Sequence, residues 1–521
     1  MEKSAVKTLQ DLVRLSAEEY GDKDFVREKS GPNDIVSKSF RQFYEDCRRL
    51  AAFLRTVSDG DKLHAAVIGP TSYAYLVGYF GTVLDGNVIV PLDAQLAPAD
   101  ICELLNRSDT TVFYYDSKFA PMIPAVKANC PAVKTYVSLQ EAEGAEITLP
   151  DILAKNEPAD LDAIQPDLLA SIVYTSGTTG KAKGVMLAHS NLVDNAMCQD
   201  GESTPDDVIM SVLPIHHIYC FTCDVLLSIR YGTTLCVNDS MLRIPQNLKL
   251  FQPTIMLLVP MIAATIYKQI QAGIKAHPEL PPAAIAKGVF GGRLKGIYSG
   301  GAYLDPSIIK GYMELGIPIA QGYGMTECSP RISTANFNEE VSLKGDVGKI
   351  VNGCEVKIVD GEIRAKSPSV MKGYYKDPEE TAAALTEDGW LCTGDLGYVE
   401  DGRIFITGRK KNLIILSNGE NVSPEEIENK FTSVDIAGEV LVYAEDGVIF
   451  AEIFPNPDIS KNMSKDDIVA ALNEAIKNIN TELTSAKTIR GLRIRDKEFE
   501  KTTSKKIKRQ QSEKGEQVRI S

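Results

Sequence analysis

Apolar residues recur along the chain at two spacings that predict alternating helices and strands. Positions 40, 43, 47, 50 and 54 are apolar, which is the spacing of one helix face, and Ser39 precedes them as a cap residue. Short apolar runs bounded by turn residues occupy 65–69 and 88–91 and predict strands. The same alternation returns at 168–173, 254–259, 294–298 and 317–321. It predicts an α/β fold with a large N-terminal body of mostly parallel sheets and helices.

The pattern changes from about residue 350 onward. Asp360-Gly361 separates the runs 355–359 and 362–366, and Asp401-Gly402 separates 396–399 and 403–407. Alternating runs around an Asp-Gly pair are typical of hairpins, so an antiparallel β subdomain is predicted beside the α/β body. The polar run 408–412 then predicts a linker. We therefore expect an N-terminal domain at 1–409 and a small α+β C-terminal domain at 410–521.

The first predicted helix of the C-terminal domain has a strong start signal. Ser423 is placed as the cap, and Pro424 occupies the first helical position. Glu425 and Glu426 follow the proline, and a glutamate at this place predicts a capping box with the serine.

Composition and charge narrow the possible partners. Fifty-six Lys and Arg against 70 Asp and Glu leave a net charge of −14, which argues against nucleic acid or an anionic membrane as a partner. No apolar run approaches the ~18 residues that span a bilayer. The N-terminal residues lack the apolar core of a signal peptide, and ten scattered cysteines are typical of reduced thiols. These features predict a cytoplasmic protein without a membrane span.

The run 174–184, Tyr-Thr-Ser-Gly-Thr-Thr-Gly-Lys-Ala-Lys-Gly, is the most informative segment. It lies between the apolar runs 168–173 and 185–187 and brings together hydroxyls, three glycines and two lysines. Glycines let backbone N–H groups approach an anion, hydroxyls add donors and lysines neutralise charge, so the run favours a phosphate-binding loop. It lacks the spacing of a Walker A loop. The alternative is a flexible, solvated turn.

This run resembles the phosphate loop of the adenylate-forming superfamily, which includes acyl-CoA synthetases, stand-alone adenylation domains and luciferases. The family pattern is Thr-Ser-Gly-Thr-Thr-Gly-Lys-Pro-Lys-Gly, from which only Ala182 departs. The resemblance implies that the phosphates of ATP are bound by Thr175, Ser176, Gly177, Thr178, Thr179, Gly180, Lys181 and Lys183.

A second motif, Gln-Gly-Tyr-Gly-Met-Thr-Glu at 321–327, follows an apolar run and so stands at a strand end, where open α/β sheets bind ligands. The resemblance implies that Tyr323 stacks on adenine beside Gly324, that Thr326 contacts the phosphates and that Glu327 helps to hold Mg²⁺. A carboxylate suits Mg²⁺ that bridges ATP phosphates. The segment 299–302 resembles the part of the family that lines the adenine and acyl pocket, which implies contacts from Gly301 and Ala302. The alternative for both segments is a glycine-rich turn.

Further motifs complete the resemblance toward the C-terminus. Residues 391–395 match the family's Thr-Gly-Asp, in which the carboxylate of Asp395 accepts hydrogen bonds from both ribose hydroxyls. Arg409 matches a second ribose or phosphate contact, and Lys411 occupies the hinge position. Gly419 is implied to lie in a pantetheine tunnel.

The run 499–509 resembles the C-terminal motif Pro-Lys-Thr-x-Ser-Gly-Lys-Ile-x-Arg. This alignment makes Lys506 the catalytic lysine that bridges the substrate carboxylate and the α-phosphate. Lys505 is the rival assignment, because it stands where the family has glycine. A solvated basic tail is the simpler alternative.

The segment 213–219, Leu-Pro-Ile-His-His-Ile-Tyr, resembles the family's Leu-Pro-x-x-His beside the acyl pocket, with His217 at the motif histidine. Relatives that activate amino acids generally place an Asp just after it. Ile218 stands there instead, which favours an acid without an α-amino group. A metal cluster of His216, His217, Cys220 and Cys223 is disfavoured, because zinc sites usually separate their ligand pairs more widely.

The resemblance implies a two-step reaction with ATP, Mg²⁺ and coenzyme A. A carboxylate attacks the α-phosphate to give acyl-AMP and pyrophosphate, and a thiol then displaces AMP, while the small C-terminal domain is expected to be mobile about its hinge. We expect an acyl-CoA synthetase for a medium- or long-chain fatty acid. The alternatives are a stand-alone enzyme that loads an acyl carrier protein and a non-enzymatic nucleotide sensor. The sensor is disfavoured because Lys506 and Glu327 are both present.

Overall fold

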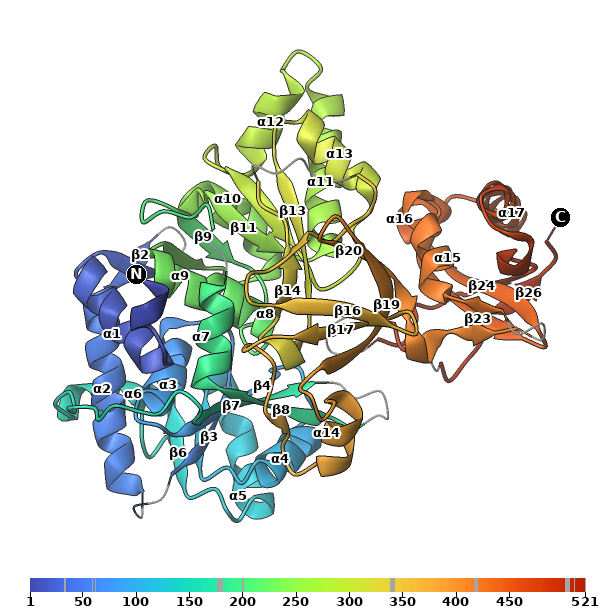
Figure 1. Ribbon diagram of the computed structural model, residues 1–521. Coiled ribbons are helices and arrows are strands. Elements are labelled where there is room, and N and C mark those ends of the chain that lie inside the picture. The colour runs from blue at the N-terminus through green and yellow to red at the C-terminus, as the bar shows by residue number, and fades with distance from the viewer. Residues whose placement is uncertain are drawn as a thin grey trace.

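The computed structural model describes residues 1–31, 34–58, 60, 62–175, 181–198, 201–337, 343–416, 420–501, 507–509 and 511–520. A large body extends to β20 (Arg403–Arg409), and a small C-terminal domain lies beside it (Figure 1). The chain passes between them through the short 3-10 helix η6 (Lys410–Asn412). The predicted fold class is confirmed, because an α/β body with mixed sheets is followed by a separate small domain.

The larger sheet of the body combines a parallel and an antiparallel half. In spatial order its described strands are β16 (Glu355–Val359), β17 (Glu362–Lys366), β19 (Leu391–Glu400), β20, β15 (Lys349–Ile350), β14 (Arg331–Thr334), β13 (Ile319–Gly324), β12 (Gly296–Ser299), β11 (Ile255–Leu258), β9 (Val208–Ser211), β10 (Thr234–Val237), β1 (Asp24–Lys29) and β2 (Ile35–Ser39). Neighbours from β13 to β1 are parallel, whereas those from β16 to β13 are antiparallel. The nucleotide motif at the end of β13 therefore lies where the two halves meet.

Both predicted Asp-Gly hairpins are confirmed. β16 pairs with β17, and β19 pairs with β20, each antiparallel. Asp360 and Gly361 have φ values of 51° and 77°, and Asp401 and Gly402 have 50° and 72°. Positive φ at both central residues gives the turn whose twist matches that of the flanking strands.

The second sheet carries the glycine-rich run. Its order is β18 (Gly373–Tyr374), β8 (Lys183–Ala188), β7 (Leu169–Thr175), β4 (Val88–Leu92), β3 (His64–Ile68), β5 (Val112–Tyr115) and β6 (Thr135–Ser138). The strands from β7 to β6 are parallel, as predicted for the early apolar runs, and β8 returns antiparallel to β7. The glycine-rich run thus lies between two antiparallel strands.

Helices cover these sheets and build the core. The predicted helix over 40–55 is α2 (Phe40–Val57), and its cap is confirmed because Ser39 accepts a hydrogen bond from the Gln42 N–H at 3.1 Å. The others in the body are α1 (Leu9–Tyr20), α3 (Tyr73–Val83), α4 (Pro98–Arg107), α5 (Ile123–Asn129), α6 (Leu149–Lys155), α7 (His189–Met197), α8 (Ile218–Cys220), α9 (Leu227–Tyr231), α10 (Ile244–Phe251), α11 (Pro260–Ala276), α12 (Pro282–Val289), α13 (Pro306–Glu314) and α14 (Pro378–Ala384). A π-helical turn, η3 (Phe221–Leu226), joins α8 to α9.

The C-terminal domain has its own sheet and core. The sheet contains β23 (Ala437–Glu445), β24 (Val448–Pro455), β25 (Gly491–Ile494) and β26 (Glu516–Val518), and a short pair, β21 (Ile414–Ile415) and β22 (Asn421–Val422), precedes it. The helices are α15 (Pro424–Lys430), α16 (Pro457–Ser460) and α17 (Lys465–Thr481). Buried Ile427, Leu472 and Ile476 belong to an apolar cluster confined to this domain.

The capping box predicted at the start of α15 is wrong. Ser423 occupies the cap position but makes no side-chain capping hydrogen bond. Its hydroxyl instead donates to Oε2 of Glu425 at 3.0 Å, and Asn412 and Arg509 donate to Oε1 of the same carboxylate. Glu426, which stands at the capping-box position, pairs with Lys487 at 2.6 Å, so tertiary contacts take the place of the local cap.

Two further findings concern the whole described chain. None of its helices combines the length and the apolar character needed to cross a membrane. All ten cysteines lie among the described residues as free thiols, and eight of them are buried.

Candidate functional site

The two ends of the glycine-rich run lie side by side. Thr175 ends β7, and Lys183 begins β8 as its antiparallel partner. Lys181 is exposed. The other predicted phosphate contacts, Ser176, Gly177, Thr178, Thr179 and Gly180, lie outside the described residues.

Lys183 joins a chain of interactions that reaches Glu327. Its ammonium group forms an ion pair with Glu380 of α14 and lies 5.1 Å from the centre of the Tyr374 ring. The Tyr374 hydroxyl donates to Oε1 of Glu327 at 2.8 Å. Two residues that the sequence predicts to act on one nucleotide are therefore linked through Tyr374, which it did not identify, and Glu380 adds an ion pair at the Lys183 end. No local motif marks Tyr374 or Glu380, because their role depends on where β18 and α14 pack.

The geometry around Glu327 fits a metal ligand. The residue lies in η5 (Thr326–Cys328) beside Thr326 and is 8% exposed. Burial and the neighbouring Glu327 charge raise the pKa of Tyr374 far above its usual range, so its hydroxyl remains a donor. Within the described ranges, no three or more His, Cys, Asp or Glu side chains are grouped to hold a metal ion. A single buried carboxylate suits Mg²⁺ that takes most of its other ligands from phosphates and water.

Tyr323, Asp395 and Arg409 form a second connected group. The Tyr323 hydroxyl donates to Oδ2 of Asp395 at 2.7 Å, and Nε of Arg409 lies 2.7 Å from Oδ1. Asp395 and Arg409 are cross-strand partners in β19 and β20, while Tyr323 comes from β13. Each carboxylate oxygen can accept two hydrogen bonds, so the buried Asp395 keeps acceptor capacity for two hydroxyls. Burial and the Asp395 charge raise the pKa of Tyr323 well above its usual range.

Glycines keep the backbone accessible around this group. A Cβ at Gly324 would overlap the carbonyl oxygen of Pro330, so only glycine fits there. A Cβ at Gly300 would lie 3.0 Å from the Tyr219 ring and 3.2 Å from the Gly322 carbonyl oxygen. Gly301 has a φ of 84°, and Gly301 and Ala302 are exposed. The predicted adenine-binding segment therefore follows β12 as an open turn.

The two histidines of the motif at 213–219 have different surroundings. His217 is exposed and stands at the N-cap of α8. The His216 ring lies 4.4 Å from the His217 ring, and its Nε2 is 3.7 Å from Oδ1 of Asp93. Burial, with a smaller contribution from His217, lowers the pKa of His216 to about 4, so this imidazole is neutral at pH 7.

The predicted residues of the C-terminal part are only partly described. Lys411 is exposed in η6, whereas Gly419 and Lys506, with its rival Lys505, lie outside the described residues. The described residues on either side of the predicted catalytic lysine are firmly held. Lys501 forms an antiparallel bridge with Ile507, and Arg509 donates to Glu425 and Glu428 at 2.9 and 2.8 Å.

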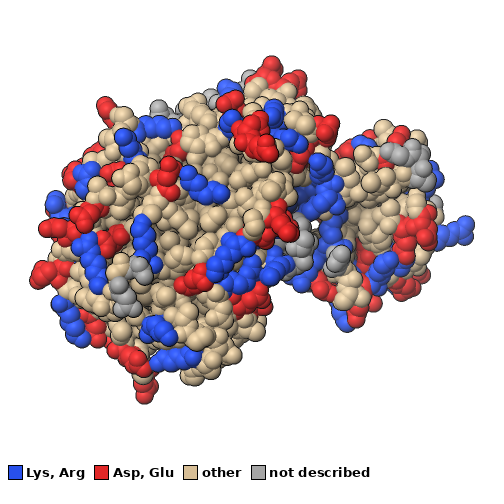
Figure 2. Space-filling model, turned by 60° about the horizontal axis from the view of Figure 1, so that its bottom comes forward, with Lys and Arg blue, Asp and Glu red and all other residues tan. Residues whose placement is uncertain are grey.

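Basic side chains gather at the junction between the body and the small domain. Lys and Arg side chains gather at this junction in the face shown in Figure 2. The connecting residues Arg409, Lys410 and Lys411 are all exposed. The connector is therefore basic, although the whole chain carries a net charge of −14.

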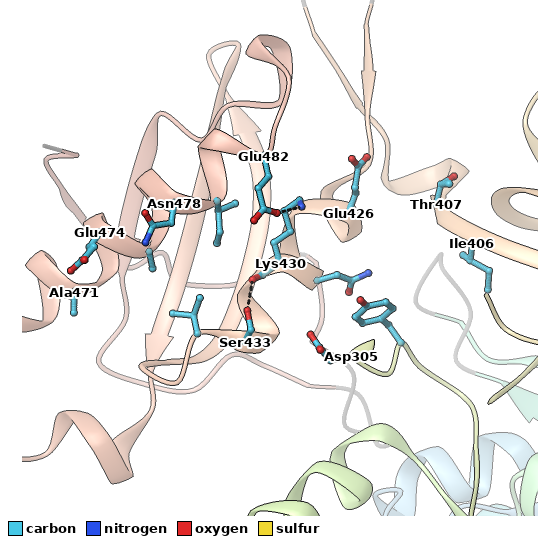
Figure 3. Close-up of a pocket in the computed structure, with 15 residues that line it drawn as sticks. Asp305, Ile406, Thr407, Glu426, Lys430, Ser433, Ala471, Glu474, Asn478 and Glu482 are labelled. Atoms are coloured by element: carbon cyan, nitrogen blue, oxygen red, sulfur yellow. Dashed lines mark hydrogen bonds and ion pairs between the residues drawn. The ribbon is translucent and has the colours of Figure 1, made fainter. Parts of the chain in front are cut away.

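A cleft of about 850 Å³ also lies between the two parts (Figure 3). Its lining includes Asp305 and Thr407 of the body and Glu426, Lys430 and Glu482 of the small domain. Lys430 is already paired with Glu482 at 2.7 Å, and the lining is rich in carboxylates, so the cleft is poorly suited to phosphate. Thr432 donates to Asp305 across the junction. The sequence contained no signal for this cleft.

Comparisons with known proteins agree with this arrangement. The profile of the AMP-binding enzymes matches residues 13–375, and that of the AMP-binding enzyme C-terminal domain matches residues 411–520. The chain is 29% identical over 439 residues to the peroxisomal long chain acyl-CoA synthetase 7 of Arabidopsis thaliana, covering 72% of this chain and 62% of that protein.

Two other similarities extend over nearly the whole chain. It is 28% identical over 509 residues to the 3-[(3aS,4S,7aS)-7a-methyl-1,5-dioxo-octahydro-1H-inden-4-yl]propanoyl:CoA ligase of Rhodococcus jostii, covering 90% of this chain and 93% of that one. The fold matches the crystal structure of an anthranilate CoA ligase in complex with anthranoyl-AMP with a TM-score of 0.83 at 19% identity, covering 97% of each chain.

Proposed function

The chain belongs to the AMP-binding enzyme family, and on this premise we propose that it activates a carboxylic acid with ATP and transfers the acyl group to coenzyme A. The convergence of separated motifs carries this proposal. Tyr323 and Glu327 lie four residues apart. Tyr323 donates to Asp395 of another predicted motif, and Tyr374 connects Glu327 to Lys183 of the glycine-rich run. The relatives are named acyl-CoA synthetases and ligases, which supports coenzyme A as the acceptor.

Each connected group has a distinct task in the proposed adenylation step. Asp395 and Arg409 hold the ribose, and Tyr323 provides an aromatic face for adenine. Lys183 and the glycine-rich loop at 175–183 bind phosphate oxygens, while Glu327 would hold Mg²⁺, which supplies positive charge to the phosphates. Thr326 adds a hydroxyl beside Glu327. Fixed donors and charges of this kind stabilise the negative charge that develops during attack on the α-phosphate.

The small domain is proposed to supply the last group and then to withdraw it. Lys506 would bridge the carboxylate and the α-phosphate during adenylation. Rotation of the domain 410–521 about Lys411 would then remove Lys506 and bring Gly419 beside the pantetheine arm of coenzyme A. Hinge positions that absorb large φ and ψ changes are typical of such closures. The exposed position of Lys411 in a short connector supports this role.

The proposed acid is a medium- or long-chain fatty acid. Ile218 provides no carboxylate for an α-amino group, and the small residues Gly300, Gly301 and Ala320 stand beside the predicted acyl pocket. The Arabidopsis relative is named for long-chain acids, whereas the Rhodococcus relative is named for a propanoyl group on a dioxo ring system. We also place the protein in the cytoplasm, which its free thiols support.

The test is pyrophosphate release with ATP, Mg²⁺ and acids of graded length. We expect release that depends on the acid, and AMP with an acyl thioester when coenzyme A is added. Absence of release with every acid, or stronger exchange with α-amino acids, would contradict the proposal. The alternative, an enzyme that loads an acyl carrier protein, requires thioester formation on free carrier protein and none on coenzyme A.

A further inference from the structure

Arg331 is a guanidinium inside the body without a carboxylate partner. It is the first residue of β14 and is paired with Gly324 of the nucleotide motif in β13. Its Nε donates to Oδ1 of Asn195 at 3.3 Å, and Nη2 donates to the main-chain carbonyl of Asn195. Within the described part of the chain, Nη1 has no hydrogen bond and Arg331 has no ion pair. Asn195 therefore holds the Nε and Nη2 edge of the guanidinium, while the Nη1 side has no anionic partner among the described residues.

The side chains around the Arg331 guanidinium are thiols and phenols. Cys198, Cys223, Tyr231 and Tyr298 lie around the guanidinium. Burial raises the pKa of Cys223 to about 12 and raises the pKa values of Cys198 and Tyr298 as well. A cation removed from water without a counter-charge is costly, whereas a ligand anion would offset this cost.

Arg331 lies within electrostatic reach of Tyr219 and Tyr298. Arg331, Tyr219, Tyr298 and Tyr323 are largely enclosed by protein, yet each keeps some accessible surface. Tyr219 belongs to the motif beside the acyl pocket and packs near Gly300. Nη1 is not among the buried polar atoms that lack a partner, so it keeps surface that a ligand can reach.

We propose that Arg331 determines specificity by binding a second carboxylate at the far end of the substrate, so that the enzyme acts on a dicarboxylic acid. This inference rests on the proposed function and refines its substrate class. A planar guanidinium with a free edge suits a carboxylate, and the fixed contacts to Asn195 reduce the ordering needed when substrate binds. The reacting carboxylate lies beside the nucleotide, and the second one meets Arg331.

The proposal is tested with acids that differ only at the far end. Initial rates of pyrophosphate release are measured for hexanoate against adipate, octanoate against suberate and decanoate against sebacate. We expect kcat/KM for the preferred diacid to exceed that of its monoacid by about tenfold or more. In Arg331→Met, kcat/KM for the diacid should fall by about 30-fold or more, mainly through KM, while the monoacid is unaffected or improved. Arg331→Lys keeps the charge and should retain part of the diacid preference.

The outcomes separate the two proposals. Release with no acid at all contradicts the proposed function. Release with monoacids but equal or weaker activity on diacids, or an Arg331→Met variant that keeps the diacid preference, overturns the specificity inference alone. If Arg331→Met no longer binds ATP, it is misfolded, and the preference of the unaltered protein together with Arg331→Lys then decides the question. If the unaltered protein and Arg331→Lys both prefer monoacids to the same extent, the specificity inference is also overturned.

Discussion

The Tyr374 hydroxyl donates a hydrogen bond to Oε1 of Glu327 at 2.8 Å, although 47 residues separate them in the chain. The Tyr374 ring also lies against the ammonium group of Lys183. One tyrosine from a two-residue strand thus positions both a predicted phosphate ligand and a predicted metal ligand. The order of the nucleotide site therefore depends on the packing of β18 against β8.

Removal of this hydroxyl tests the connection. Tyr374→Phe should raise the Mg²⁺ concentration for half-maximal pyrophosphate release by about tenfold, because a lost hydrogen bond to a charged group costs about 1.5 kcal/mol. The control is Tyr375→Phe, since the Tyr375 hydroxyl donates to Asp109 on the surface at 2.6 Å. Equal effects of the two variants would show that Tyr374 does not position Glu327.

Asp395 is expected to control ATP affinity. Asp395→Asn removes the charge that pairs with Arg409 and weakens the acceptor for the Tyr323 hydroxyl, so the Kd for ATP should rise by about 10- to 100-fold. Titration calorimetry measures this change. Asp401→Asn, in the turn between the same two strands, is the control, because Asn tolerates the positive φ there. An unchanged ATP affinity in Asp395→Asn would contradict the ribose assignment.

The register of the C-terminal motif has a direct test. Lys506→Ala should reduce acyl-AMP formation by about a hundredfold or more but spare thioester formation from supplied acyl-AMP, because the charge acts on the α-phosphate only in the first step. Lys505→Ala is the matched control and should have little effect. Exchange of the two phenotypes would place the catalytic lysine one residue earlier.

The hinge assignment predicts that the two half-reactions separate. Proline fixes φ near −65° and restricts the preceding residue, so Lys411→Pro should favour one arrangement of the domains. Acyl-AMP formation should stay within about tenfold, a change of about 1.4 kcal/mol in the barrier, while thioester formation falls much further. Lys411→Ala removes the charge without fixing φ and serves as the control. Equal losses in both half-reactions would make Lys411 an ordinary linker residue.

Asp224 is expected to make stability depend on pH. Burial raises its pKa to about 7, Oδ1 has no hydrogen-bond partner, and Cys220 Sγ lies 3.6 Å from Oδ2. The folded state then holds the proton that the unfolded chain loses above about pH 4, so this carboxyl lowers stability progressively between about pH 4 and 7, by about 4 kcal/mol at most. The amide of Asp224→Asn does not titrate in this pH range, so the variant lacks this loss of stability. Relative to the unaltered protein, its Tm should therefore rise between pH 5 and 8, and a constant difference across that range would refute the assignment.

Local sequence was sufficient for several elements because the forces that form them are local. The helix capped by Ser39, the two Asp-Gly hairpins and the early parallel strands follow from periodicity and turn chemistry alone. The start of α15 followed the same local rules, yet its capping box was lost because Ser423 donates to Glu425 and because Glu426, at the capping-box position, pairs with the distant Lys487. Local rules fail where a distant partner offers a stronger interaction.

The sequence by itself determined the fold class, the family and the order of the predicted nucleotide motifs along the chain, because these depend on residue type and short-range spacing. Only the tertiary structure decided that Tyr374 joins Glu327 to Lys183, that Asp395 lies between Tyr323 and Arg409, and that Arg331 has no ion pair within the described ranges. These pairings depend on which strand lies beside which. That order is set by the packing of whole sheets, which no short stretch of sequence encodes.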